Sequence, residues 1–410
     1  MFLPRQRSGA LVGLLLAAIV LPGATHASDG EPLALRRWPG GAVSIETHWG
    51  LQLAINAAAD TEERLPRPAD QHVATSDDLD HVLYRPPNAA KALWISAAEA
   101  DRLQPTADGR QAKPGENALR VKSVGPRQTA ACLRISVDGV LIAFVPVDAM
   151  QQAKGLKGEA LKDADVLILS VSDGKQLQQS QLSGFIAAIQ PKVVLLNPVT
   201  DDVELKLEKF RELIGATAKV VETNHNTLAV SSTLAETPKP IVVTLSTEPW
   251  QMNDELTELF AAMEKSCSDS QKVFSKLSVK QLNFKPANGT HTPRWNCEHM
   301  MGRQLLFFSQ IFHAIAPAIP VMDLNPKQMP PDYEFAHPDW DGKEEARQMQ
   351  RVSDFTRRFA YLLDGLELNK KAPGSSWPTL KALLRQMIRH YGEHTANTVK
   401  KFELPGWPDE

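Results

Sequence analysis

A change in hydrophobic periodicity near residue 247 constrains the fold of this 410-residue chain more than any other feature. Before it, short runs rich in Val, Ile and Leu are bounded by Gly, Asp, Asn or Pro, which is typical of β-strands. After it, apolar residues recur every three or four positions over long stretches, which is typical of amphipathic helices. The pattern therefore predicts two domains of different class, as the length also favours.

The first of these regions, residues 35–246, is predicted to be a layered α/β or α+β domain, because helical stretches at 180–188 and 202–214 alternate with the later strands. The dipeptide Asp138-Gly139 between two apolar runs predicts a tight hairpin. The expected strands are 42–46, 51–55, 92–95, 132–137, 140–146, 166–170, 193–197, 218–222 and 241–245.

The second region, residues 247–410, is predicted to be a four-helix bundle. Its helices are expected at 253–277, from near Asn296 to about Phe312, at 344–368 and at 380–402. Asn296 is a residue type that caps helix N-termini, so we expect it to begin the second helix. The connection between the second and third helices is long.

The first 27 residues have the pattern of a secretory leader. Arg5 and Arg7 precede an apolar run over 10–20, and small residues surround a cut expected after Ala27. No second stretch is hydrophobic enough to span a membrane, so no integral membrane segment is expected after cleavage. The sequence thus predicts a periplasmic or secreted protein.

The charge balance argues against a nucleic-acid partner. The formal net charge is −3, and it becomes −5 when a leader with two arginines and no acidic residue is removed. Neither this mild acidity nor any concentrated basic patch fits nucleic-acid binding.

Three cysteines leave at least one thiol unpaired in an oxidising compartment. Cys267 and Cys297 fall in neighbouring predicted helices and could form a disulfide. The alternative is that both are buried free thiols.

The pair His390 and His394 in the last predicted helix is the strongest indication of a functional site. Residues at i and i+4 lie on one helix face, so both imidazoles can reach one ion. Zinc-type ions need three or four protein ligands, so another helix must supply a third. His299 in the second helix is the best candidate, and the alternatives are Glu298, His313 and His337.

Two of these features give residues 250–405 a resemblance to the DinB-like family of bacterial four-helix bundles. Pro293 and Trp295 precede a histidine at the start of the second helix, and an H-x-x-x-H pair ends the fourth. The resemblance implies a zinc or nickel ion held by His299, His390 and His394, with a coordination position open to water or substrate. It also implies thiol-transfer or hydrolytic chemistry on a small molecule.

One residue departs from the family pattern. The family histidine usually lies about one turn further from the tryptophan, where this chain has Gly302 or Arg303. The permanent charge of Arg303 would oppose a metal ion, or it would bind an anionic group of the substrate beside the ion.

The N-terminal region resembles a degenerate metallo-β-lactamase domain, which implies an αββα sandwich. The family's T-H-x-H-x-D-H loop corresponds to 75–81, where Ser76 and Asp78 replace two histidines while Asp80 and His81 remain. The family's bridging aspartate corresponds to Asp148. No histidine occurs at 122–128 or 198–201, where the family has further ligands, so the dinuclear site is expected to be lost. At most Asp78, Asp80, His81 and Asp148 would hold one cation.

These observations favour an exported protein whose bundle binds a metal ion and acts as a hydrolase or transferase on a small molecule. Glu298 or Glu393 would then serve as the base. The alternative is a non-catalytic binding or scaffold protein in which both ancestral metal sites are degenerate.

Overall fold

Two compact units make up the chain. One contains Ala24–Gln251 and the short segment Ala318–Pro320, and the other contains Met252–Pro317 and Val321–Glu410. The computed structural model describes residues 32–47, 52–57, 61, 64–65, 71–74, 93–96, 120–124, 132–137, 139–147, 161–172, 179–200, 219–234, 240–323 and 337–409.

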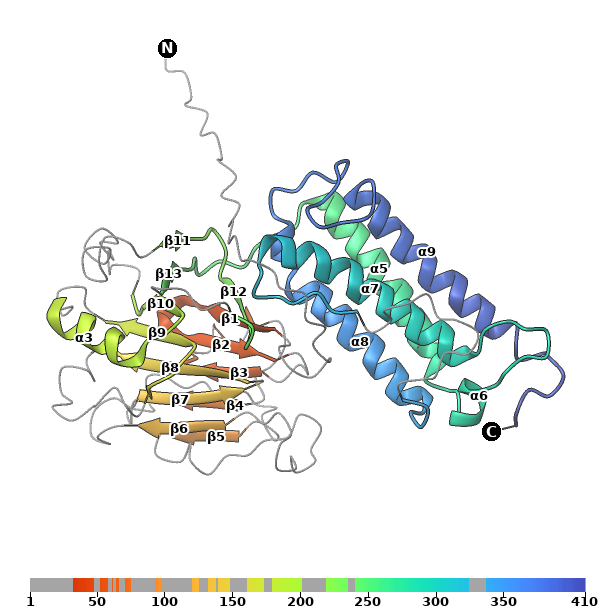
Figure 1. Cartoon of the computed structure of the whole chain (residues 1–410), viewed down its shortest axis with the longest axis horizontal. Coiled ribbons are helices and arrows are strands. Elements are labelled where there is room, and N and C mark those ends of the chain that lie inside the picture. The colour runs from red at the N-terminus through yellow and green to blue at the C-terminus, as the bar shows by residue number, and fades with distance from the viewer. Residues whose placement is uncertain are drawn as a thin grey trace, which may run out of the picture. The chain divides into compact units, whose positions relative to one another are not determined.

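The N-terminal unit is built on two mixed β-sheets (Figure 1). The six-stranded sheet has the order β12-β1-β2-β3-β4-β5, and the seven-stranded sheet has the order β11-β13-β10-β9-β8-β7-β6. The strands are β1 (Leu33–Arg37), β2 (Val43–Glu46), β3 (Gln52–Ile55), β4 (Gln71–Ala74), β5 (Leu93–Ser96), β6 (Arg120–Val124), β7 (Cys132–Val137), β8 (Val140–Pro146), β9 (Val166–Val171), β10 (Val193–Pro198), β11 (Val220–Glu222), β12 (Thr227–Val230) and β13 (Ile241–Thr244).

Strand β9 shows why these segments form layers. It is apolar on both faces, because successive side chains of a strand point to opposite sides of the sheet. Val166 and Ile168 belong to the core cluster shared by the two sheets. Leu167 and Leu169 belong to a second cluster, together with Leu182 of helix α3 (Gln179–Ile189). The unit thus stacks sheet on sheet, with a helix on the outer face of the larger one.

The predicted layered domain is confirmed, and its expected strands agree with the observed ones to within two residues at each end. Strands β7 and β8 pair antiparallel with Val137 opposite Val140, as the predicted hairpin requires. Gly139 has a φ of 73°, a conformation that glycine adopts without a steric penalty. The prediction missed β1, β4, β6 and β12, and the expected helix at 202–214 lies outside the described residues.

The C-terminal unit is a four-helix bundle, as predicted. Helix α5 packs against α8 and α9, and α7 packs against the same two helices (Figure 1). A short helix, α6, lies between the first two long ones, and a 3-10 turn, η5, follows α8. The bounds are α5 (Asp254–Phe274), α6 (Val279–Leu282), α7 (Pro293–Ile315), α8 (Gly342–Arg358), η5 (Ala360–Leu363) and α9 (Leu380–Val399).

The sequence of α5 explains its position in the bundle. The side chain of Asn253 accepts a hydrogen bond from the Leu256 amide at 2.9 Å and caps the helix. The buried residues recur every three or four positions, so they form one stripe that faces the other helices. They are Leu256, Phe260, Met263, Cys267, Ser270 and Phe274. Each large apolar member contributes about 1.5–3 kcal/mol by its burial.

Two of the predicted helix bounds need correction. Helix α7 begins at Pro293 with Thr292 as its cap, so Asn296 does not cap it and lies one turn inside. The third helix does not continue to 368, because α8 ends at Arg358 and the chain turns into η5.

The three cysteines are buried and free, which agrees with the second of the two alternatives for Cys267 and Cys297. Burial raises the pKa of Cys132 to about 12, so its thiol is protonated and unreactive at neutral pH. Among the described residues, no helix is both long enough and apolar enough to span a lipid bilayer.

Candidate metal centre

The start of α7 fixes the first histidine of the candidate centre. Thr292 Oγ1 accepts a hydrogen bond from the Trp295 amide at 3.0 Å, and Pro293 occupies the first helical position, which its fixed φ suits. From this start, Trp295 and His299 follow one turn apart on the same face of the helix.

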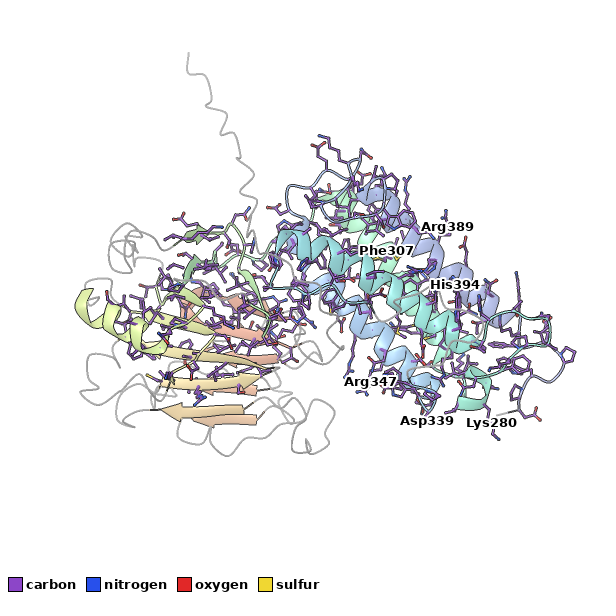
Figure 2. The ribbon with its side chains drawn as sticks, viewed as in Figure 1. Lys280, Phe307, Asp339, Arg347, Arg389 and His394 are labelled. Carbon is purple, nitrogen blue, oxygen red and sulfur yellow. The ribbon has the colours of Figure 1, made fainter. Side chains whose placement is uncertain are left out.

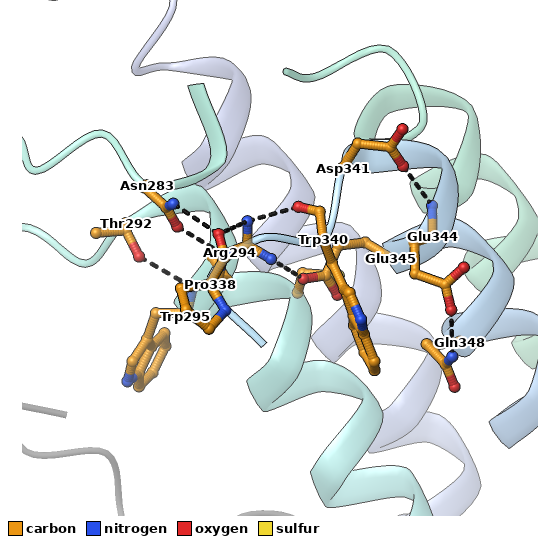
Figure 3. A network of polar contacts seen from close by, with 11 residues as sticks. Asn283, Thr292, Arg294, Trp295, Pro338, Trp340, Asp341, Glu344, Glu345 and Gln348 are labelled. Carbon is orange, nitrogen blue, oxygen red and sulfur yellow. Dashed lines mark hydrogen bonds and ion pairs between the residues drawn. The ribbon is translucent and has the colours of Figure 1, made fainter. Parts of the chain in front are cut away.

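A buried polar network holds this start in place (Figure 3). Arg294 Nη1 pairs with Glu345 Oε1 of α8 at 2.5 Å, and neither side chain is exposed to solvent. Its other nitrogens donate to Asn283 Oδ1 at 2.6 Å, Pro338 O at 3.0 Å and Trp340 O at 2.7 Å. Burial raises the pKa of Glu345, while the nearby guanidinium acts in the opposite direction. One guanidinium thus joins α7, α8 and two connecting segments.

Helix α9 supplies the other two histidines. Thr379 caps it by accepting a hydrogen bond from the Ala382 amide at 3.0 Å. His390 is 8% exposed, and His394 one turn later is half-buried, as is His299. Both rings of α9 lie on the side of the helix that faces His299 of α7.

The three predicted ligand residues come together. The ring centroid of His299 lies 4.9 Å from those of His390 and His394, which are 4.5 Å from each other. One nitrogen from each ring lies within 4.8 Å of the other two. Among the residues that the structure describes, no other three His, Cys, Asp or Glu side chains converge in this way.

The three alternative third ligands lie elsewhere. His313 is in the last turn of α7, about 21 Å along the helix from His299 at 1.5 Å per residue. His337 stacks on Trp340, with ring centroids 3.7 Å apart. Glu298 does not belong to the group of converging side chains.

The electrostatics keep these rings neutral. Burial lowers the pKa of His299 to about 3, with further lowering from His390, His394 and Arg303. Burial likewise lowers the pKa of His390 to about 4, and it lowers that of His394. A histidine must be neutral to bind a metal ion, so the cluster is in its ligand form at pH 7.

The hydrogen bonding of the rings also leaves nitrogens available. Nδ1 of His299 and Nδ1 of His390 are buried and have no hydrogen-bond partner among the described residues. Nδ1 of His394 lies 2.9 Å from Asn296 Oδ1, which leaves Nε2 of that ring for an ion. Buried polar atoms without partners are rare in folded proteins, and a cation among the three rings would satisfy them.

The spacing of the donors tests whether an ion fits. Bonds of about 2.1 Å in tetrahedral geometry place donor nitrogens about 3.4 Å apart. The donor atoms lie within 4.8 Å of one another, so the widest pair would have to approach by up to about 1.4 Å to hold an ion in this geometry. The three imidazoles suit a zinc or nickel ion.

An aromatic stack next to the cluster was not predicted. The Trp295 ring lies between two imidazoles, 3.6 Å from His291 at an interplanar angle of 8° and 4.4 Å from His299 at 13°. His291, Trp295 and His299 are four residues apart along the chain, and this spacing could have indicated the stack. The stack restricts the rotation of His299 about its side chain.

Arg303 lies on the same helix as His299, near Phe307. It follows His299 by one turn on α7, and its guanidinium carbon is 6.0 Å from the ring centroid of Phe307. Figure 2 labels Phe307 on α7 and His394 on α9. The positive charge of Arg303 contributes to the lowered pKa of both His299 and His390.

The lowered pKa values predict how stability depends on pH in metal-free protein. Between about pH 6.5 and pH 4 the unfolded chain binds these protons and the folded chain does not, so the free energy of unfolding should fall as pH falls. His299 and His390 together should contribute about two protons to the difference that urea unfolding reports across this range. A His299→Gln/His390→Gln variant should lose that part of the slope, and an unchanged slope would contradict the assignment.

The N-terminal candidate ligands Asp78, Asp80, His81 and Asp148 lie outside the described residues, so the loss of that metal site stays a prediction. At the described end of β10, Asn197 Nδ2 donates to Gly41 O at 2.7 Å, which is a structural contact.

A family model and solved structures are similar to different parts of the chain. The model of the DinB superfamily matches residues 262–397, which include all three histidines. A comparison with curated proteins finds no match.

Solved structures match the other half. A metallo-β-lactamase superfamily protein from Thermotoga maritima is 13% identical, covers 52% of this chain and 98% of its own, and has a TM-score of 0.34. A metallo hydrolase from Ignicoccus hospitalis is 16% identical, covers 48% of this chain and 98% of its own, and has a TM-score of 0.32. A metallo-β-lactamase fold protein from Bacillus subtilis is 9% identical, covers 49% of this chain and 99% of its own, and has a TM-score of 0.33.

Residues 262–397 of the helical region match the model of the DinB superfamily.

Proposed function

We propose that the bundle binds one divalent metal ion through His299, His390 and His394 and uses it in hydrolytic or group-transfer chemistry on a small molecule. The convergence of three neutral imidazoles from α7 and α9 is the observation that supports this most strongly. Zinc and nickel are the expected ions, because both bind imidazole readily.

Three protein ligands are characteristic of catalytic and not of structural zinc sites, which are closed by four. When bound, such an ion acts as a Lewis acid and lowers the pKa of a coordinated water or thiol. The residues of the chain orient the reactants: the histidines fix the position of the ion, and Arg303 holds an anionic group of the substrate through its guanidinium.

The experiment is a chelation and reconstitution assay with small ester, amide, phosphate and thiol-transfer substrates. We expect turnover that disappears on chelation, returns with zinc or nickel, and is absent from His299→Ala. Arg303→Met should keep the metal content and raise KM. Turnover that resists chelation would overturn the proposal.

A non-catalytic binding role is the second candidate, and the position of Glu393 favours it. The Glu393 side chain is 57% exposed, and its carboxylate forms an ion pair with Arg389 Nε at 3.4 Å on the surface of α9. No carboxylate joins the histidine cluster among the described residues. A chain that binds one equivalent of metal but turns over none of the substrates would support this role.

We also propose that the protein is exported, on the basis of the leader pattern in residues 1–27, which lie outside the described residues. The mature chain would then begin at Ser28. Mass spectrometry of the protein from expressing cells reads this mass directly, and an intact Met1 form alone would contradict export by cleavage.

A further inference from the structure

A buried amide connects the third ligand to the rest of the bundle. Asn296 of α7 is 2% exposed, and its Oδ1 lies 2.9 Å from His394 Nδ1. Its Nδ2 donates to Thr398 Oγ1 at 3.0 Å, and Thr398 is fully buried. One side chain of α7 therefore contacts two residues that lie one turn apart on α9.

The direction of these bonds decides where the His394 ring carries its proton. An amide oxygen only accepts hydrogen bonds, so the nitrogen facing it must be Nδ1–H. A neutral imidazole has a single N–H, and Nε2 then keeps the lone pair that a metal ion needs. With the amide reversed, His394 would carry its proton on Nε2, and that nitrogen could not be a ligand.

Thr398 completes the first arrangement. Its hydroxyl oxygen accepts the Asn296 N–H at 3.0 Å while the amide oxygen faces the ring. Nδ1 of His299 and Nδ1 of His390, by contrast, are buried without a hydrogen bond among the described residues. Among the three rings, His394 is therefore the one whose Nδ1 is hydrogen-bonded to a side chain that the structure describes.

We infer that Asn296 is a positioning residue that, with Thr398, holds His394 in the Nδ1–H tautomer and leaves Nε2 free for a divalent ion. The inference rests on the proposed metal centre. Hydrogen bonds of this kind to the non-ligating nitrogen fix the orientation of a metal-binding histidine, and losing one reduces metal affinity about 10–100-fold.

The first experiment needs no metal. Long-range 1H–15N NMR of chelator-treated, 15N-histidine-labelled full chain should show His394 protonated on Nδ1. Asn296→Leu should give a mixture of tautomers, and Asn296→Asp should restore the Nδ1–H form, because a carboxylate also accepts from Nδ1. Protonation of wild-type His394 on Nε2 would overturn the inference.

The second experiment measures zinc affinity by competition with a chromophoric chelator. We expect Asn296→Leu to bind about 10–100-fold more weakly and Asn296→Asp to recover most of the affinity. Thr398→Val removes the acceptor for the Asn296 amide. Its zinc affinity should lie between those of Asn296→Leu and Asn296→Asp.

Thr356→Val is the matched control, because Thr356 is also fully buried and its Oγ1 accepts from an α7 amide, Gln304 Nε2, at 2.9 Å. Thr356→Val should lose about as much stability as Thr398→Val but keep the zinc affinity of the wild type. Equal affinity in wild type and Asn296→Leu would overturn the inference. A wild-type chain with the Nδ1–H tautomer that binds no ion would contradict the metal centre alone.

Discussion

Replacing both histidines of α9, as His390→Ala/His394→Ala, should remove the metal ion from the protein. The double variant keeps one imidazole of the cluster, and one nitrogen cannot hold a zinc-type ion that needs three or four protein ligands. We expect metal content to fall from about one equivalent per chain to below about 0.1, measured by plasma mass spectrometry on protein purified without chelator.

His337→Ala is the matched control, since this histidine belongs to the same unit but stacks on Trp340 and does not join the cluster. It should keep the full equivalent. A double variant that retains the metal would locate the ion elsewhere. Asp80, His81 and Asp148 would then be the residues to change next.

Breaking the buried ion pair between α7 and α8, as Arg294→Met, should destabilise the helical unit by about 3–5 kcal/mol. The change leaves the Glu345 carboxylate fully buried without its cation, and it removes the donors to Asn283 and two backbone carbonyls. Urea unfolding followed by the circular dichroism of the helices would measure the loss.

The double variant Arg294→Met/Glu345→Met should recover most of that loss, because two apolar side chains replace both charges. Lys265→Met is the control for an exposed pair. Its 2.5 Å contact with Asp269 joins side chains that are 75% and 46% exposed, and its loss should cost less than about 1 kcal/mol. Equal losses at the two pairs would show that the burial of Arg294 contributes nothing.

Much of the fold could be predicted because its pattern is local. Strands such as β8 and β9 are continuous runs of apolar residues, and the stripe of α5 repeats every three or four residues. Strand β1 was missed because it carries Arg36 and Arg37. Both arginines are buried. Arg36 forms an ion pair with Glu46 at 2.7 Å, and Arg37 donates to Leu245 O at 2.8 Å. The residue types alone do not reveal these contacts.

The candidate site was partly predictable for the same reason. His390 and His394 are neighbours on one helix, so their spacing alone indicates a pair. His299 remained one candidate among several for the third ligand, because contact between two helices leaves no local pattern in the sequence. Asn296 was read as a helix cap from its residue type, yet the Thr292-Pro293 pair starts the helix earlier and turns Asn296 toward His394.

X-ray absorption spectroscopy of the metal-loaded full chain tests the central claim most directly, because it counts the ligands of the ion. Three imidazole nitrogens at about 2.0–2.1 Å are expected, with that signal absent from the His390→Ala/His394→Ala protein. A bound ion surrounded by oxygen alone, or the same imidazole signal in both proteins, would contradict it.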